Sequence, residues 1–172
     1  RHLISLGHPE LMFLGGRDSS VTHRRRHQGF LAAAAAAANV HYDIFTILSG
    51  SKIEDGYHTG LAYFTRCIEE KRPIATGILC ISDHFALGVM QAAVETGVDI
   101  PGQVSLIGFD DVSFASLPKI QLTTISQPKE EICVAAVRTL EELIAADGPA
   151  PISCKTIEPV LVRRDTCGPP GR

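Results

Sequence analysis

IPGQVSLIGFDD, residues 100–111, is the stretch that decides the fold of this chain. A Pro-Gly turn precedes the apolar run 104–108, and two adjacent carboxylates, Asp110 and Asp111, follow after Phe109. A short apolar run bounded by turn residues is typical of a strand inside a parallel sheet. Open α/β sheets bind ligands at the carboxyl ends of their strands, so both carboxylates are predicted to lie at a binding edge.

Predicted strands and helices alternate along the chain. Apolar runs predict strands at 10–16, 42–48, 76–81, 104–108, 122–125 and 156–163. The segments between them predict helices at 22–38, 54–71, 83–96 and 128–146, and Gly97 is expected to close the third of these. This alternation predicts βαβ units, that is, a Rossmann-like α/β fold with a parallel sheet flanked by helices.

The composition excludes several classes of protein. With 172 residues, 45% apolar and 20% charged, the chain can form one domain or a large piece of a two-lobed molecule. A net charge of −3 argues against a nucleic-acid-binding surface on this chain. No apolar run approaches the roughly 18 residues of a membrane span, so we expect no membrane partner.

Five cysteines are an odd number, and no two are spaced as CxxC. Free thiols in a reducing compartment are therefore expected, which indicates the cytoplasm. Residues 1–8 are typical of the end of a helix that stops at Gly7, so we expect the chain to be a fragment of a longer protein.

Polar residues follow each of the first four predicted strands. They lie at 17–22, 49–53, 82–83 and 109–112. Because the carboxyl ends of parallel strands meet at one edge, these segments are expected to form one rim. Its hydroxyls, carboxylates and arginine are suited to a sugar or a similar polar small molecule.

Arg26 and Asp110 are the strongest candidates for ligand contacts. Gly29 lets the helix of Arg26 pack closely, which directs Arg26 toward the rim, whereas Arg24 and Arg25 are better explained as solvated arginines. Asp111 is expected to cap the turn that follows it, which leaves Asp110 for the ligand.

Three further candidates have structural explanations of comparable weight. Ser82 and Asp83 are also natural N-caps of the helix that follows them. Ser51 and Glu54 form the S-x-x-E pattern of a capping box, and this interpretation outweighs ligand binding for Ser51.

Metal, cofactor and catalytic motifs are not evident in the sequence. His23 and His27 are spaced i,i+4, but flanking arginines repel a cation and no third ligand is apparent, so we expect no metal site. The sequence has no GxGxxG, GxxxxGK[ST] or GxSxG pattern. We therefore expect neither a cofactor nor enzymatic activity.

The segments HLISLGH, FLGG, RHQGFLAA, SDHFALGVMQAAVETGVDIPGQVSLIGFDD and LTTISQP together resemble the lactose-repressor (LacI/GalR) family of bacterial transcription regulators. The resemblance covers residues 1 to about 165. It implies a periplasmic-binding-protein-like core of two Rossmann-like lobes with the effector between them. In that family, effector contacts fall on positions that match Thr22, Arg26, Ser82 and Asp110. Ser82 departs from the asparagine often found there, and Ser51 replaces an aromatic residue that stacks on the ligand in some members.

The resemblance also implies the organisation of the chain. Residues 1–166 would be a fragment of the effector-binding core, with the carboxyl-side lobe at 1–124, a helix crossing to the other lobe at 125–150 and a returning strand at 151–166. Residues 167–172 are expected to be a loose tail. The helix-turn-helix headpiece, the hinge helix and most of the amino-side lobe would be missing, so operator DNA would be bound through an N-terminal domain outside this chain.

The family pairs its subunits through the helix that matches 85–94 here. We therefore expect a homodimer that uses an apolar stripe on this helix and one nearby side chain. The residues are Leu87, Met90, Gln91, Val94 and Phe114.

Two functions remain open at this point. The first is effector sensing and dimerisation within a bacterial transcription regulator, expected to be a repressor. The alternative is a periplasmic sugar-binding receptor of a transport or chemotaxis system. An upstream helix-turn-helix would favour the first and a signal peptide the second, and five unpaired cysteines favour the first.

Overall fold

A six-stranded sheet in the order β2-β1-β3-β4-β5-β6 forms the centre of the protein. The computed structural model describes residues 1–37, 43–47, 49–146 and 154–171. The strands are β1 (Glu10–Leu14), β2 (Asp43–Ile47), β3 (Gly77–Cys80), β4 (Ser105–Phe109), β5 (Thr123–Ser126) and β6 (Val160–Val162). The first five are parallel and β6 runs antiparallel to β5.

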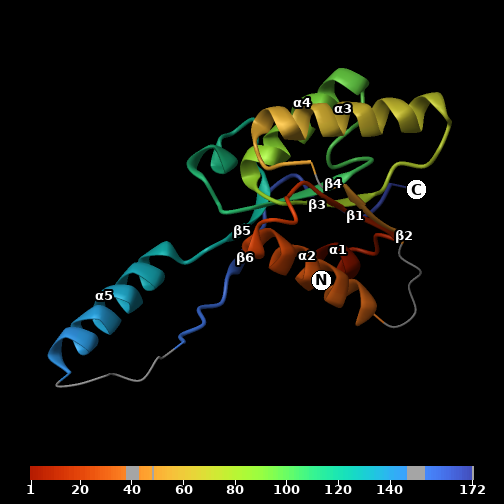
Figure 1. Ribbon diagram of the computed structural model, residues 1–172. Helices are drawn as coiled ribbons and strands as arrows, with labels where there is room; N and C mark the ends of the chain where they lie inside the picture. The colour runs from red at the N-terminus through yellow and green to blue at the C-terminus, as the bar shows by residue number, and fades with distance from the viewer. Residues whose placement is uncertain (38–42, 48, 147–153, 172) are drawn as a thin grey trace.

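Helices cover both faces of the sheet (Figure 1). The helical elements are α1 (His2–Ser5), α2 (Val21–Ala35), α3 (Ile53–Glu69), α4 (Asp83–Thr96), the 3-10 turn η1 (Ser113–Ser116) and α5 (Lys129–Ala145). α3 and α4 pack on one face, and α1 and α2 lie on the other. The predicted Rossmann-like α/β fold is therefore confirmed.

The sheet is strongly apolar because it is buried on both faces. Met12, Leu14, Ile78 and Leu106 have essentially no exposed surface. In register, Leu14 lies opposite Ile47 on one side and Cys80 on the other. The carboxyl ends of β1, β2 and β3 therefore lie at the same edge of the sheet.

α3 and α4 cross in backbone contact. A Cβ added to Gly56 would collide with the carbonyl oxygen of Phe85, and one added to Gly88 would collide with that of Ile53. Glycine at both positions lets the two helices approach closely. This close packing holds the first turn of α4 next to the rim.

The expected elements are present within a few residues of their predicted ends. α4 has the predicted bounds, and Gly97 closes it in the left-handed conformation with φ of 72°. The last strand is shorter than predicted, because the structure assigns only Val160–Val162 to it. Parts of the predicted segments 22–38 and 42–48 lie outside the described residues.

The prediction of a loose tail is wrong for Cys167 and Gly168. Gly168 O accepts from His8 Nε2 at 2.9 Å and from Ser105 Oγ at 2.9 Å. Cys167 Sγ donates to Leu106 O at 3.3 Å. These bonds fasten the segment to the amino end of β4.

α5 extends away from the sheet (Figure 1). Its large apolar side chains, among them Val134, Leu140 and Ile144, are exposed. It buries none of its residues. The predicted crossing of this helix to a second lobe stays a prediction. Within the described residues, no helix is long and apolar enough to cross a membrane.

Candidate ligand-binding site

Arg26 and Asp110 meet at the carboxyl edge of the sheet. Arg26 Nη2 lies 3.0 Å from Asp110 Oδ1, and the two side chains are 15% and 27% exposed. Arg26 Nη1 donates to Ile81 O at 2.6 Å. The Phe109 ring lies under the guanidinium, with its centroid 3.7 Å from Cζ. These contacts hold the planar donor group of Arg26 in one orientation at the end of β4.

The backbone at Asp110 and Asp111 is strained. Their φ angles are 112° and 49°, in the left-handed region that residues other than glycine rarely adopt. Such a residue costs about 1–3 kcal/mol and persists only where its surroundings hold it. Asp110 N donates to Ile125 O at 2.9 Å, and Asp111 Oδ1 accepts from Arg164 Nη2 at 2.7 Å. Strain of this kind concentrates at functional sites.

The role predicted for Asp111 is wrong. No side chain caps η1, whose N-cap is Val112. Asp111 instead forms an ion pair with Arg164, and Arg164 Nη1 also donates to Leu122 O at 2.7 Å. The ion pair with Arg164 therefore occupies the carboxylate that was expected to cap the turn. The same ion pair connects the residues after β6 to the rim.

Asp83 is a support of the rim and not part of its surface. Its side chain is fully buried, Oδ1 accepts from Thr124 Oγ1 at 2.5 Å, and Oδ2 accepts from Val112 N at 2.9 Å. Burial is the main cause that raises its pKa. A Cβ at Gly108 would collide with this carboxylate, so glycine there leaves room for it. The ligand contact expected for Asp83 is therefore wrong, because the carboxylate is fully buried and each of its oxygens has a protein donor.

Ser82 is the N-cap of α4. Its Oγ accepts from Phe85 N at 3.2 Å and lies 3.1 Å from Ser51 O, to which it donates. Ser82 is 8% exposed, so only a small part of it reaches the rim. Both interpretations of Ser82 offered by the sequence remain compatible with this position.

The predicted capping box of Ser51 and Glu54 is wrong by one residue. α3 begins at Ile53, and Asp55 Oδ2 accepts from Ser51 N and Lys52 N, each at 3.0 Å. These two backbone hydrogen bonds lower the pKa of Asp55. Because the Ser51 side chain does not cap the helix, its half-buried hydroxyl lies at the rim without that structural role.

Two residues of the site were missed at the sequence level. Gln127 Nε2 donates to Asp110 Oδ1 at 2.6 Å, and Phe109 supports Arg26. Gln127 directly follows β5, so the rule that polar residues gather after strands pointed to it, but the rule was applied only to the first four strands. Phe109 lies in the predicted rim segment 109–112, but the sequence analysis assigned it no role.

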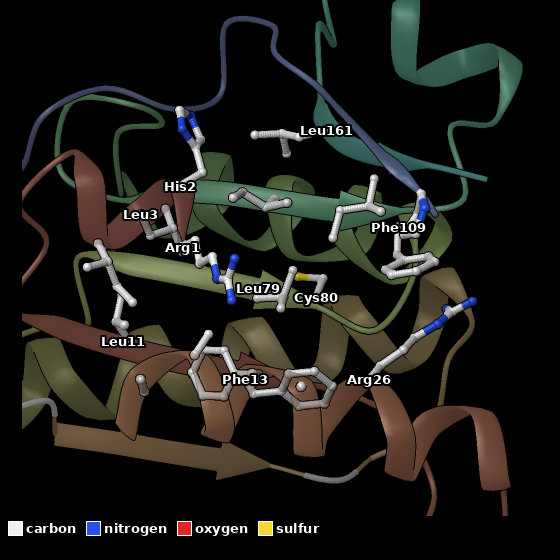
Figure 2. A pocket seen from close by; sticks show the side chains of 18 of the residues that line it. Arg1, His2, Leu3, Leu11, Phe13, Arg26, Leu79, Cys80, Phe109 and Leu161 are labelled. Carbon is white, nitrogen blue, oxygen red and sulfur yellow. The ribbon is translucent and has the colours of Figure 1, made fainter. Parts of the chain in front are cut away.

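A pocket of about 650 Å³ opens beside this rim, on the sheet face that carries α1 and α2. Figure 2 shows Arg26 and Phe109 at one end and apolar side chains such as Leu11, Phe13 and Leu161 in the interior. Thr22, exposed in the first turn of α2, and Gln127 also line it. Arg1 and His2 also line the pocket, away from Arg26 and Phe109, so hydrogen-bonding groups lie both at the rim and away from it.

His23 and His27, the two histidines considered as metal ligands, contact other protein groups. His23 Nδ1 accepts from Arg17 N at 3.1 Å, and the His27 ring packs 5.0 Å from that of Phe13. Burial, followed by the charges of Arg26 and Arg17, lowers the pKa of His23. Among the described residues, no group of three histidine, cysteine, aspartate or glutamate side chains is placed to hold a metal ion.

The apolar stripe predicted for dimerisation lies on the outer side of α4. Val94 is 83% exposed, Gln91 is exposed, and Leu87 and Met90 are half-buried. Phe114 is half-buried beside the start of the same helix, with its ring edge-on to His84 at 5.2 Å. The five residues are therefore accessible in the single chain.

A mostly parallel sheet with a polar rim at its carboxyl edge defines one lobe of the periplasmic-binding-protein type. The family model described as periplasmic binding protein-like domain matches residues 1–167. The chain belongs to this family, and its resemblance to the LacI/GalR transcription regulators is confirmed by the relatives that it matches.

Curated relatives support this assignment. The regulator GalR of Escherichia coli K12 is 32% identical over 173 residues, which is 99% of this chain and 48% of that protein. The repressor PurR of Mannheimia succiniciproducens is 35% identical over 147 residues, 84% of this chain and 42% of that protein. The chain thus spans about half the length of these relatives.

Solved structures have the same fold. A dimeric Lac repressor with an 11-residue C-terminal deletion superposes with a TM-score of 0.84 at 27% identity, covering 98% of this chain and 59% of that one. A LacI-family regulator from Corynebacterium glutamicum gives a TM-score of 0.78 at 29% identity, covering 98% and 61%.

Proposed function

We propose that this chain senses a small neutral polyol, a sugar or a close derivative, within a bacterial transcriptional repressor. The observation that carries the proposal is the Arg26–Asp110 pair at the carboxyl edge of the sheet, 3.0 Å apart and partly exposed. A polyol hydroxyl can accept from Arg26 and donate to Asp110. Thr22, Ser51 and Ser82 would add weaker contacts from neighbouring elements.

The charge balance of the rim favours a neutral ligand. The positive charge of Arg26 is already balanced by Asp110, and Asp111 is a second carboxylate next to it. An anionic ligand would have to displace Asp110 from Arg26 in the presence of both carboxylates, and a cation would approach Arg26 and Arg25. Because the paired groups are ordered before the ligand arrives, binding loses less conformational entropy.

The whole protein would act through parts outside this chain. Several relatives are described as helix-turn-helix regulators or repressors, which supports operator DNA as a partner bound through a missing N-terminal domain. We also propose homodimerisation through the α4 stripe and a cytoplasmic location. The similarity to regulators argues against the alternative of a periplasmic transport receptor and against an enzyme.

Calorimetry on the full-length protein tests the ligand site, with D-ribose, D-glucose and D-galactose as the first probes. Truncation of a hydrogen-bonding charged group costs about 1.5–3 kcal/mol. Arg26→Ala and Asp110→Ala should therefore each weaken sugar binding at least about tenfold, while operator binding stays intact.

Arg24→Ala is the matched control for these variants. Arg24 lies in the same helix but is exposed and donates to Asp18 O, away from Asp110. We expect it to bind the sugar as the wild type does. Unchanged affinity in both Arg26→Ala and Asp110→Ala, or tighter binding of a sugar phosphate than of the parent sugar, would contradict the proposal.

A further inference from the structure

Arg164 follows β6 and joins it to the turn that carries Asp110. Its Nη2 lies 2.7 Å from Asp111 Oδ1, its Nη1 donates to Leu122 O at 2.7 Å, and its side chain is 13% exposed. The backbone of Arg164 is also fixed, because its N donates at 3.0 Å to Oγ1 of the fully buried Thr123. Contacts with the beginning of β5 therefore orient the guanidinium toward Asp111.

The turn from Asp110 to Val112 is strained and is held at three points. The amides of these two residues each donate at 2.9 Å, to a carbonyl oxygen of β5 and to a buried carboxylate of α4. Between them, Asp111 has a φ of 49°, and Arg164 is the only hydrogen-bond partner of its side chain among the described residues. A residue other than glycine keeps such a backbone only where its surroundings hold it. The ion pair with Arg164 therefore offsets the strain at Asp111.

The same ion pair separates two adjacent carboxylates. Asp110 Oδ1 accepts from Arg26 Nη2 at 3.0 Å, whereas Asp111 pairs with Arg164. Without Arg164, the unpaired charge of Asp111 would repel Asp110 and compete with it for Arg26. Relaxation of the strained turn and this competition would both disturb the pair to which a polyol binds.

We propose that Arg164 is a positioning residue of the ligand site, which holds the strained turn at Asp111 and keeps this carboxylate away from the Arg26–Asp110 pair. The inference rests on the proposed function, because it concerns the groups that bind the sugar. Arg164 acts through Asp111 and does not touch the sugar itself. Its loss lowers the fraction of molecules in which Asp110 is placed for binding, and the apparent affinity falls by the same factor.

Calorimetry on the full-length protein measures this factor, with whichever of D-ribose, D-glucose and D-galactose binds best. Arg164→Ala should weaken binding at least about fivefold, the population ratio that corresponds to the smallest strain of this kind. The double variant Arg164→Ala/Asp111→Gly should bind more tightly than Arg164→Ala. Glycine adopts the left-handed backbone freely and has no carboxylate to compete for Arg26. Unchanged affinity in Arg164→Ala, or a double variant that binds no better than it, would overturn the proposal.

Asp111→Ala and Asp111→Gly give the same comparison if Arg164→Ala does not fold. Both variants remove the ion pair, and they differ only in the Cβ atom, which is disfavoured in the left-handed region. Asp111→Ala should therefore bind the sugar about five- to thirtyfold more weakly than Asp111→Gly. A merely structural role would lower the thermal stability of Asp111→Ala and leave the two affinities equal, and this result would contradict positioning.

Arg163→Ala is the matched control. Arg163 directly precedes Arg164 and is exposed. Its truncation removes the same charge from the same segment but keeps the ion pair between Arg164 and Asp111. Sugar affinity should stay as in the wild type. A loss as large as that of Arg164→Ala would mean that net charge, and not the ion pair, sets the affinity, and the proposal would fail.

Hydrogen exchange tests the turn without a ligand. The amides of Asp110 and Val112 are both hydrogen-bonded, so their exchange reports the opening of the turn. Mass spectrometry that resolves single amides should show both exchanging at least about fivefold faster in Arg164→Ala than in the wild type. Exchange should be unchanged in Arg163→Ala. If Arg164→Ala leaves the exchange of both amides unchanged, Arg164 does not hold the turn and the proposal is wrong.

The two series of measurements distinguish this inference from the proposed function. A sugar that binds Arg164→Ala with wild-type affinity, although the two amides exchange faster, overturns the positioning role and leaves the ligand site intact. If none of the sugars binds, the proposed function and the positioning of its site fail together. The exchange data then still decide whether Arg164 holds the turn.

Discussion

Replacing Asp83 with alanine would remove the buried support of the rim. Its carboxylate accepts from Thr124 Oγ1 at 2.5 Å and from Val112 N at 2.9 Å. Alanine leaves both donors without this acceptor, and a buried donor without a partner costs about 1–3 kcal/mol. Because Val112 is only half-buried, we expect the free energy of unfolding to fall by about 2–4 kcal/mol. For a domain of this size, that lowers Tm by roughly 4–16 °C.

Asp83→Asn is the matched variant. Its amide keeps the shape of the carboxyl, can accept from Val112 N, and can donate to Thr124 Oγ1 once that hydroxyl turns. We expect it to cost less than Asp83→Ala, since Val112 N keeps an acceptor and Thr124 Oγ1 keeps a hydrogen-bond partner. Thermal and urea unfolding of the full-length protein would measure both variants. An Asp83→Ala variant as stable as the wild type would refute the role of these two hydrogen bonds.

The difference in stability between the wild type and Asp83→Asn should depend on pH, and its sign can be worked out from the pKa of Asp83. Burial raises the pKa of Asp83, the hydrogen bonds from Thr124 and Val112 oppose this, and the charges of Asp110 and Asp111 reinforce it. A carboxyl whose pKa rises on folding contributes stability that is present below its unfolded pKa of about 3.9 and is lost as the pH rises through the folded pKa. The wild type should therefore gain stability relative to Asp83→Asn as the pH falls from neutral toward that unfolded pKa. A difference that is constant with pH would contradict this.

Further predictions concern packing, titration and assembly. Gly88→Ala forces a Cβ against the backbone of α3 and should cost at least about 1–3 kcal/mol in urea unfolding, whereas Gly29→Ala, with open space around it, should gain up to about 1 kcal/mol. Burial lowers the pKa of His8, and this effect is larger than the opposite effect of the hydrogen bond to Gly168. The contribution of His8 to the free energy of unfolding should therefore be lost as the pH falls below about 6.5, and a His8→Gln variant should lack this loss. Val94→Glu should convert a full-length dimer to monomers in light scattering. This chain alone should give no sequence-specific gel shift with DNA, because its net charge is −3.

The fold could be predicted from the sequence because the apolar runs, the helix caps and the turn residues all indicated the same elements. α4 shows this best. The side-chain oxygen of Ser82 caps the beginning of the helix, and the left-handed backbone of Gly97 ends it. The rim followed from the same pattern, since parallel strands bring their carboxyl ends together. The pairing of Arg26 with Asp110 could be inferred at that level, without any knowledge of distances.

The errors arose where long-range contacts decide between equivalent local choices. Asp83, Asp110 and Asp111 are all carboxylates after strands, and nothing local distinguishes a buried acceptor from an exposed one. The difference comes from Thr124 and Arg164, which lie far along the chain. The tail was likewise expected to be loose because Gly-Pro-rich ends usually are, but hydrogen bonds that involve the side chains of Cys167 and Ser105 hold its first residues to β4.

These three carboxylates have different roles because each has a different partner. Asp110 pairs with Arg26 on α2 and accepts from Gln127, and Asp111 pairs with Arg164 after β6. Asp83 forms no ion pair within the part of the chain that the structure describes, and its partners are Thr124 and Val112. Left-handed backbone at 110 and 111 turns successive carboxylates toward opposite neighbours. Loss of Asp83 should therefore affect folding, and loss of Asp110 should affect binding. Stability and sugar affinity measured on the same variants would separate the two, and an Asp110→Ala variant that lost stability as Asp83→Ala does, while keeping its affinity, would invert this assignment.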